Sequence, residues 1–408
     1  CARCFGGVIM RLHVLLRLVA IGIFAGHVAA AGAGDRSLSR HERAMLDTFA
    51  GWPIAWDKDD SNRGSGKPLA IAVGARLFFA GGLSKDGTIS CATCHIPGRG
   101  FTDGRARARG LANLPRNTPT LLDSRWQRWY GWGGAHDNLW SQTLKAVVTP
   151  AEMAGTPAQV KAYLLSDVNL ACAIDKAFDV RLATLAPEAS LVLATKALAA
   201  YQETLVSAPS AFDRFINAVK ANDAEAAAQY PVAALRGYRL FVGAGRCHLC
   251  HLGPRFTNDE FATAGVPYFT DDGVDKGRYQ GVKRLKGNRY SRLGSFTDAP
   301  DSPRARFTRF AKRNADLFGA FKVPSLRNLV HTAPYMHDGS LATLADVVEH
   351  YSQMNEERLH NIANSLLRAL KLSAQEKAGL QAFLESLSAP LPTVNHAALM
   401  APLESCRR

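Results

Sequence analysis

The sequence lacks two patterns that would point to other classes of protein. Over its 408 residues it has little of the alternating apolar and polar order that β-strands show. It also lacks an apolar run long enough to span a membrane comfortably. Segments with helical periodicity are separated by long loops rich in Gly, Pro and Arg. These features exclude a sheet-based fold and predict an all-α fold with long loops.

The N-terminal segment has the order of a secretory signal. From Met10 it reads MRLHVLLRLVAIGIFAGHVAAAGAG, in which Arg11 and Arg17 precede a short apolar core that small residues end. This order predicts cleavage near Ala29–Ala31, so we expect residues 1–31 to be pre-sequence and signal peptide. The mature protein is then periplasmic and not an integral membrane protein. A retained N-terminal anchor is the alternative.

Four of the eight cysteines stand in two C-x-x-C-H motifs. The motifs are Cys91, Cys94 and His95, and Cys247, Cys250 and His251. This is the attachment signature of haem c, in which two thioethers hold the porphyrin and the histidine binds its iron. In an exported chain cysteines form disulfides or carry haem, so we expect two covalently bound haems. A single zinc site is the alternative, but it favours far closer cysteine pairs.

The other four cysteines carry no such motif. Cys1 and Cys4 precede the expected start at Met10, and Phe5 follows them where a haem motif has histidine. Cys172 and Cys406 are left as a candidate disulfide, which the sequence alone does not establish.

A missing histidine decides what the first haem can do. A haem iron has two axial positions, and His95 fills only one. No histidine follows until His136 and no methionine until Met153. An open position at this iron indicates an enzyme, whereas a filled one indicates an electron carrier.

The spacing of the motifs predicts two domains of similar size. The second motif lies 156 residues after the first. We expect an N-terminal haem domain over 32–215, a C-terminal haem domain over 216–395 and a tail over 396–408. Amphipathic helices should close each domain, one over Ser190–Val206 and one over Ser373–Ser388, the latter with a capping box of Ser373 and Glu376. The stretch Ser207–Phe215 is expected to connect the halves.

The chain has a formal charge of +14, and much of the excess lies in two blocks. These blocks are Lys276–Arg292 and Arg304–Arg313. Either they bind an acidic partner protein or they are solvated loops. Nucleic acid is not expected as a partner outside the cytoplasm.

Longer runs around the motifs resemble the di-haem cytochrome c peroxidase and MauG family, between about Leu69 and Leu387. The matching runs are ARLFFAGGLSKDGTISCATCH, GFTDGR, RNTPTLL, GWGGAHDNLWSQTL, TPAEM, GRCHLCH, FKVPSLRN and TAPYMHDGSLATLADVVEHY. The resemblance implies two c-type domains whose haems face each other across their interface, and peroxide-dependent oxidation. Conventional peroxidases of the family have a capping histidine in the loop after the first motif, so its absence is closer to MauG. His136 is the one alternative cap.

The resemblance also implies the residues that serve the first haem. Glu152 in TPAEM would move a proton between the two peroxide oxygens, with Gln142 as its hydrogen-bonding companion. A solvated carboxylate at a helix start is the alternative for Glu152. Where relatives have proline four residues after the glutamine, this chain has Ala146. Trp132 aligns with the tryptophan that lies between the haems and relays oxidising equivalents.

At the second haem the resemblance places the sixth ligand fourteen residues after His337, at Tyr351. Methionine at this position is typical of electron-accepting peroxidases, whereas tyrosine is typical of MauG and favours oxidised iron. The alternatives are Met354, Met336 and His350, with Tyr351 then a core residue. MauG has a surface tryptophan two residues before this motif, but here that residue is Gly245, so oxidation needs another exit.

A calcium ion between the domains is part of the family pattern. Its ligands would come from Asn117 and from the backbone of Thr332 and Pro334, since calcium favours hard oxygen donors. Such residues also commonly stabilise turns.

Three functions follow from these residues. The first is a MauG-like enzyme that uses hydrogen peroxide to oxidise an external reductant, such as a Trp or Tyr of a partner protein. The second is a cytochrome c peroxidase that removes peroxide with electrons from a small cytochrome or copper protein. The third is a di-haem electron-transfer protein without turnover.

Overall fold

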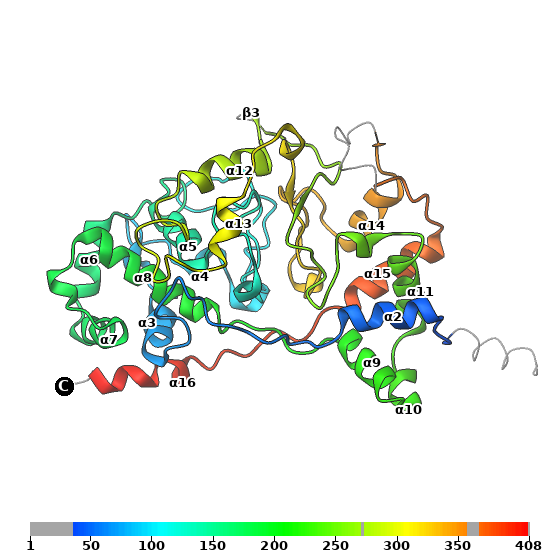
Figure 1. Cartoon of the computed structure of the whole chain (residues 1–408), viewed down its shortest axis with the longest axis horizontal. Helices are drawn as coiled ribbons and strands as arrows, with labels where there is room; N and C mark the ends of the chain where they lie inside the picture. Colours follow the sequence, from blue (N-terminus) through cyan, green and yellow to red (C-terminus); the bar gives the residue numbers. More distant parts are fainter. Residues whose placement is uncertain (1–35, 271–272, 357–366, 407–408) are drawn as a thin grey trace, which may run out of the picture.

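The computed structural model describes residues 36–270, 273–356 and 367–406 (Figure 1). The predicted signal peptide lies outside these residues. Within them, no helix is both long enough and apolar enough to cross a membrane. The fold is all-α as predicted, and its only strands in these ranges form two short antiparallel ribbons, β1 with β4 and β2 with β3. The strands are β1 (Phe261–Ala262), β2 (Phe269–Thr270), β3 (Gly273–Val274) and β4 (Phe321–Lys322).

The first half of the molecule is built around one buried helix, α8 (Pro187–Gln202). It begins three residues before the predicted start, because a proline suits the first position of a helix, and it ends before Val206. Four helices pack around it or its neighbours: α3 (Pro68–Phe78), α5 (Leu139–Val148), α6 (Pro157–Leu165) and α7 (Val168–Phe178). A Cβ at Gly74 of α3 would lie 2.0 Å from the carbonyl oxygen of Ala197, so glycine permits this close helix crossing.

The second half has its own core between α11 (Val232–Val242) and α15 (Ala374–Ser386). Gly237 and Gly379 meet where these helices cross, since a Cβ at Gly237 would lie 1.9 Å from the Gly379 carbonyl oxygen. The capping box predicted for α15 is present: the Ser373 hydroxyl accepts the Glu376 N–H, and the Glu376 carboxylate accepts the Ser373 N–H at 2.8 Å. Further helices here are α9 (Ala211–Lys220), α10 (Ala224–Ala228) and α14 (Leu344–Ser352).

The predicted connection Ser207–Phe215 is wrong in its second part, because α9 begins at Ala211. Ser210 forms a capping box with Asp213, whose carboxylate accepts the Ser210 N–H at 2.7 Å. Phe212 and Phe215 of this helix are buried in the second core. The predicted domain boundary at 215/216 therefore falls inside a helix of the second half.

The first and last described helical elements each pack on the opposite half of the molecule (Figure 1). Helix α2 (Arg40–Phe49) lies with α9 and α15, where Leu46 and Phe49 are buried in the second core. The C-terminal α16 (His396–Met400) and the 3-10 turn η10 (Ala401–Cys406) return to α3 and α7 of the first half. A disulfide joins Cys406 to Cys172 of α7.

The remaining elements are short. They are the helices α4 (Cys91–Cys94), α12 (Gly277–Lys286) and α13 (Ala305–Arg309), and the 3-10 turns η1 (Gly81–Leu83), η2 (Pro97–Arg99), η3 (Ser124–Trp126), η4 (Leu182–Thr184), η5 (Cys247–Leu249), η6 (Ala315–Leu317) and η7 (Leu329–His331).

Candidate active site

The first C-x-x-C-H motif forms the single-turn helix α4, which ends at His95. The His95 Nδ1–H donates to the carbonyl oxygen of Phe101 at 3.0 Å, and Phe101 takes a left-handed conformation with φ 58°. Burial lowers the pKa of His95, so its ring is neutral. A neutral imidazole held at Nδ1 by a backbone carbonyl presents Nε2 as a metal ligand.

The second motif repeats this local design. The His251 Nδ1–H donates to the carbonyl oxygen of Phe256 at 2.9 Å, and Phe256 also has positive φ, 53°. Burial again lowers the pKa of the imidazole. Two motifs far apart in the sequence thus orient their histidines through the same hydrogen bond.

The residues around these motifs fit haem c better than zinc. The four cysteines are half-buried thiols, and none is in a disulfide. In the part of the chain that the structure describes, no three His, Cys, Asp or Glu side chains converge as a metal site would need. Leu249, inside the second motif, is 44% exposed on a cavity wall, which is apolar surface that a porphyrin would cover.

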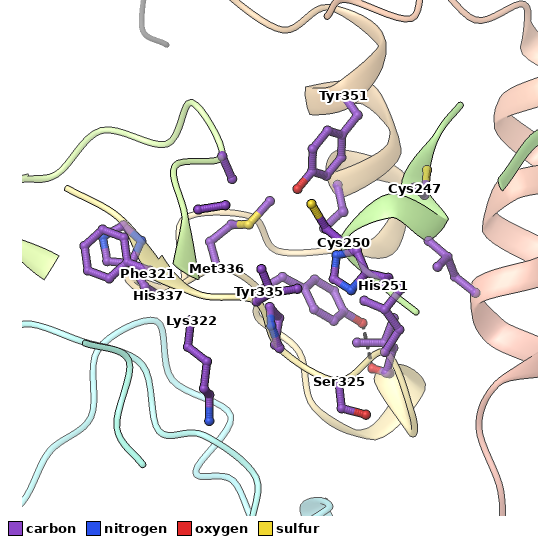
Figure 2. A pocket seen from close by; sticks show the side chains of 18 of the residues that line it. Cys247, Cys250, His251, Phe321, Lys322, Ser325, Tyr335, Met336, His337 and Tyr351 are labelled. Atoms are coloured by element: carbon purple, nitrogen blue, oxygen red, sulfur yellow. Dashed lines mark hydrogen bonds between the residues drawn. The ribbon is translucent and has the colours of Figure 1, made fainter. Parts of the chain in front are cut away.

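A cavity of about 570 Å³ opens beside the second motif. Its walls come from both halves of the molecule, including Trp132 from the first half and Cys247, Cys250 and His251 from the second. Figure 2 shows the Tyr351 ring pointing from α14 into the same space as Cys250 and His251. Burial, together with the nearby thiols of Cys247 and Cys250, raises the pKa of the Tyr351 phenol. A phenolate here would therefore need a cation beside it.

The alternative sixth ligands lie in different places. Met336 lines the cavity and faces it near Tyr351 (Figure 2). His350 contacts the carbonyl oxygen of Ala264 through Nε2 at 2.7 Å. Met354 is 4% exposed and packs away from the cavity wall. Of the four candidates, Tyr351 and Met336 are the two that reach the cavity.

Trp132 lies on the same wall, held at both its ring and its backbone. Its indole N–H donates to the carbonyl oxygen of Asn117 at 2.9 Å, and its own carbonyl accepts the Lys322 N–H at 2.8 Å. The neighbouring Trp129 and Tyr130 are 4% and 7% exposed and act in packing. Trp126 packs against Trp52, with ring centroids 4.9 Å apart and ring planes tilted by 60°.

The three residues expected to bind calcium also line this cavity. They are Asn117, Thr332 and Pro334. The Asn117 side-chain amide donates to the carbonyl oxygen of Arg105 at 2.8 Å, which leaves its Oδ1 to face another group.

Gln142 lies on α5, and Glu152 lies in the turn that follows this helix. Gln142 is on the half-buried face of α5, and its Oε1 lies 3.1 Å from where a Cβ on Gly131 would stand, next to Trp132. The Glu152 carboxylate forms an ion pair with Lys145, three residues after Gln142 and on the same face. Its negative charge also acts on the titration of Cys94 and His95, which places it beside the first motif.

Lys145 is a site residue that sequence reasoning missed. Its position three residues after Gln142 was a usable signal, because residues three apart share a helix face. Ala146, the departure from the family pattern, is half-buried on this same face.

His136, the alternative cap for the first iron, is engaged elsewhere. Its Nδ1 lies 2.8 Å from the Ser141 hydroxyl and 3.2 Å from the Asn288 amide nitrogen. Burial lowers its pKa to about 3, and the positive charges of Lys145 and Arg284 act in the same direction. The ring is therefore a neutral member of a buried polar cluster.

The two basic blocks are not simply solvated loops. The first contains α12, and two of its arginines are buried: Arg278 and Arg292, at 4% and 7% exposed. Arg292 pairs with Asp59 at 2.6 Å and Asp60 at 2.5 Å. Part of the positive charge of the block is therefore buried in ion pairs inside the fold.

The comparisons agree with this geometry. Residues 68–221 match the model of the family described as di-haem cytochrome c peroxidase. The methylamine utilization protein MauG of Methylorubrum extorquens is 35% identical over 328 residues, which cover 79% of each chain. The cytochrome-c peroxidase IdrP2 of Denitromonas iodatirespirans is 31% identical, over 93% of this chain and 92% of that protein.

A solved structure extends the similarity to three dimensions. The crystal structure of a MauG-like protein associated with microbial copper homeostasis superposes with a TM-score of 0.62 at 26% identity, covering 86% of this chain and 98% of that one. The fold and the motifs define a di-haem c-type oxidoreductase. The chain belongs to the di-haem cytochrome c peroxidase and MauG family. It is a di-haem peroxidase or oxidase, and the family implies two haem c groups, hydrogen peroxide and a redox partner.

Proposed function

We propose that this enzyme works in the MauG manner: it reacts with peroxide at the haem of the first motif and oxidises an external reductant, such as a Trp or Tyr of a partner protein. The observation that carries the proposal is Tyr351, whose phenol points into the cavity beside Cys250 and His251 (Figure 2). An anionic oxygen ligand favours oxidised iron, which suits a centre that stores oxidising equivalents.

The residues that would hold the two haems are the cysteines and histidines of the motifs. Cys91, Cys94 and His95 would hold the first. Cys247, Cys250, His251 and Tyr351 would hold the second. When bound, the haems supply the iron that reacts with hydrogen peroxide and keeps its oxidising equivalents until a reductant is oxidised.

Glu152 supplies acid–base chemistry at the first site. Its carboxylate accepts a proton from one peroxide oxygen and returns it to the other, which leaves as water. The ion pair with Lys145 holds the carboxylate on the face of α5 that also bears Gln142. Because the His136 ring contacts Ser141 and Asn288, it does not cap the iron of the first motif. The free position at that iron then stays open to peroxide.

Trp132 connects the two sites. It comes from a turn of the first half, lines the cavity beside the second motif, and has Gln142 close to its neighbour Gly131. An indole fixed at both its ring nitrogen and its carbonyl is suited to pass oxidising equivalents between the haems. A calcium ion bound by Asn117, Thr332 and Pro334 would stiffen the same wall.

The setting of the enzyme is also part of the proposal. We place it in the periplasm, where haem c and the Cys172–Cys406 disulfide are both stable. We place the junction of the two haem domains at residues 207–210, before α9.

One observation favours a second function. Met336 also faces the cavity (Figure 2). If its thioether binds the second iron, the haem has a higher potential and takes electrons from a small cytochrome or copper protein. The enzyme is then a peroxide-removing cytochrome c peroxidase.

Electron paramagnetic resonance of the ferric protein separates these functions. We expect one high-spin and one low-spin haem in the wild type. Tyr351→Phe removes the phenol oxygen and keeps the ring, so the low-spin signal should be lost or altered. Met336→Leu should leave it unchanged. The opposite pattern assigns the ligand to Met336 and favours the peroxidase with a small electron donor.

The same preparations test Glu152. Glu152→Gln should lower the rate constant for reaction with peroxide by about 10²-fold or more, with both haems retained. Glu225→Gln, on the exposed side of α10, is the matched control and should change nothing. If Glu152→Gln reacts at the wild-type rate, Glu152 is not the acid–base group. If the wild type does not react with peroxide, the protein is an electron-transfer module.

A further inference from the structure

A band of exposed positive charge runs over α12 and the segment from α13 to Arg313. Between Lys276 and Arg313 the chain has twelve Lys and Arg residues and two Asp. We define the basic face as seven exposed residues of this band, which lie in the last turn of α12, in α13 and just after α13. They are Lys283, Arg284, Lys286, Arg306, Arg309, Lys312 and Arg313.

The two parts of the basic face are joined in space. Helices α12 and α13 contact each other and lie next to one another in Figure 1. The Arg313 guanidinium sits 4.4 Å above the ring of Tyr279 on α12. The charges therefore form one surface rather than two separate runs.

Among the described residues these charges form no salt bridge, although Arg313 lies over the Tyr279 ring and Arg284 acts on His136. In the ranges that the structure describes, none of the seven side chains pairs with a carboxylate, whereas other arginines of the two blocks do. Phe310, between Arg309 and Lys312, is 71% exposed. An apolar ring within unpaired positive charge is typical of a surface that binds another macromolecule.

The inner side of α12 connects this surface to Trp132. Gly281 touches the turn of the first half, since a Cβ there would stand 1.8 Å from the carbonyl oxygen of Gly133. Gly277 makes the same close approach to Ala320, whose carbonyl accepts the Arg278 N–H at 2.7 Å. The helix thus packs by its backbone against the residue that follows Trp132, directly behind the cavity wall.

We propose that the basic face is the docking surface for a small acidic redox protein, which exchanges electrons with the enzyme through the turn that holds Trp132. The inference rests on the proposed peroxide-dependent oxidation of an external reductant, which both candidate functions share, and adds the chemistry of the partner. Unpaired charge of one sign raises the association rate of a partner of opposite charge.

The experiment uses one carrier in two charge states. Reduced mitochondrial-type cytochrome c is basic, and the same protein with succinylated lysines is acidic. We expect the holoenzyme with peroxide to oxidise the acidic form with a kcat/KM at least tenfold higher at low salt, and the difference should shrink as salt is added. A neutral hydroquinone serves as the reductant that needs no docking.

Charge reversal locates the surface. The triple variant Lys283→Glu, Arg284→Glu, Lys286→Glu should lose at least tenfold in kcat/KM for the acidic form and keep hydroquinone turnover. Arg306→Glu, Arg309→Glu, Lys312→Glu should do the same from the other element. The matched control is Arg40→Glu, Arg43→Glu, Arg181→Glu, which changes the net charge equally at exposed sites on α2 and after α7 and should keep both activities.

Three outcomes would overturn the docking surface. The first is an equal loss of kcat/KM in the control variant, and the second is an equal kcat/KM for the two carrier forms. The third is a charge reversal that abolishes binding to anionic vesicles but leaves carrier oxidation unchanged, which assigns the face to a membrane surface. Failure of the proposed function is distinguishable, because wild-type enzyme would then show no peroxide-dependent hydroquinone oxidation at all.

Discussion

His136 shows how a single half-buried side chain can be tied to the pH response of the fold. Its imidazole is in contact with Ser141 and Asn288, and Lys145 and Arg284 place positive charge nearby. Burial is the largest reason that its pKa falls to about 3. The folded protein therefore keeps this ring neutral at pH values where the unfolded chain protonates it.

This difference predicts that the stability of the folded protein decreases as the pH is lowered. Below a pH of about 6.5 the unfolded chain binds a proton at His136 that the folded chain does not, so the free energy of unfolding drops by up to about 1.4 kcal/mol per pH unit. His136→Gln cannot titrate, and it should lose about 3 kcal/mol less than the wild type between pH 7 and pH 4. Urea unfolding at both pH values measures this.

The exposed His41 of α2 supplies the control for that comparison. His41→Gln should follow the wild type. If His136→Gln also follows the wild type, the ring is protonated in the folded state and the buried cluster is incorrectly described.

At the scale of residues, local motifs were readable and long-range pairs were not. The two C-x-x-C-H motifs attach haem covalently through residues at fixed spacing, so each can be recognised from its own five residues. Arg292 is different, because its partners Asp59 and Asp60 lie more than 200 residues away. No local pattern distinguishes it from the exposed arginines of the same block, and only the fold shows which charges are buried.

Helix α12 depends on glycine at the scale of elements. The backbone of Gly281 lies against Gly133, and an added Cβ would stand 1.8 Å from the Gly133 carbonyl oxygen. This oxygen is part of the backbone, so it cannot move aside as the end of a flexible side chain could. Gly281→Ala should therefore push α12 from the turn that holds Trp132 and lower the free energy of unfolding by about 1–3 kcal/mol, in spite of the better helix propensity of alanine.

A second glycine of the same helix makes the control. At Gly287, which ends α12 with φ −89°, the nearest atom to an added Cβ is 3.7 Å away. Gly287→Ala should stay within about 0.5 kcal/mol of the wild type in thermal or urea unfolding. Equal effects of the two substitutions would mean that α12 is not packed on Gly133.

Helices with a visible cap could be predicted, and their ends could not always be placed. Ser373 and Glu376 marked the start of α15 correctly, because both halves of a capping box are local. The same motif at Ser210 and Asp213 starts α9, but the Pro and Ser residues before it favoured a loop. Helix α9 is stabilised by the burial of Phe212 and Phe215 against helices of the second half, which is a tertiary effect.

At the scale of the whole molecule, the two ends of the chain cross between the halves. Helix α2 belongs to the core of the second half, and the tail belongs to that of the first, where Leu403 and Cys406 are buried. The tail is further held by the Lys176 ammonium, which donates to the carbonyl oxygen of Ser405 at 2.9 Å. Two domains defined only by their haem motifs could not reveal this exchange, because the sequence carries no signal for which core a terminal segment joins.

The disulfide makes the return of the tail permanent. Cys172 and Cys406 are 234 residues apart in sequence, so their bond closes a loop of more than half of the 408-residue chain in the unfolded state. A cross-link that closes such a long loop typically contributes about 2–4 kcal/mol to stability. In urea unfolding the double variant Cys172→Ser, Cys406→Ser should therefore have a free energy of unfolding lower by this amount, while its haem absorption in the folded state stays that of the wild type.

Reduction of the wild type offers an independent check on the same quantity. Wild-type protein unfolded in the presence of a thiol reductant should match the double variant, since both lack only the cross-link. A double variant as stable as the oxidised wild type would show that the packing of α16 on α3 holds the tail without the bond. Loss of haem absorption along with stability would instead assign the tail a part in shaping the first haem site, because the tail packs on α3 and α7, which share one core with Cys91.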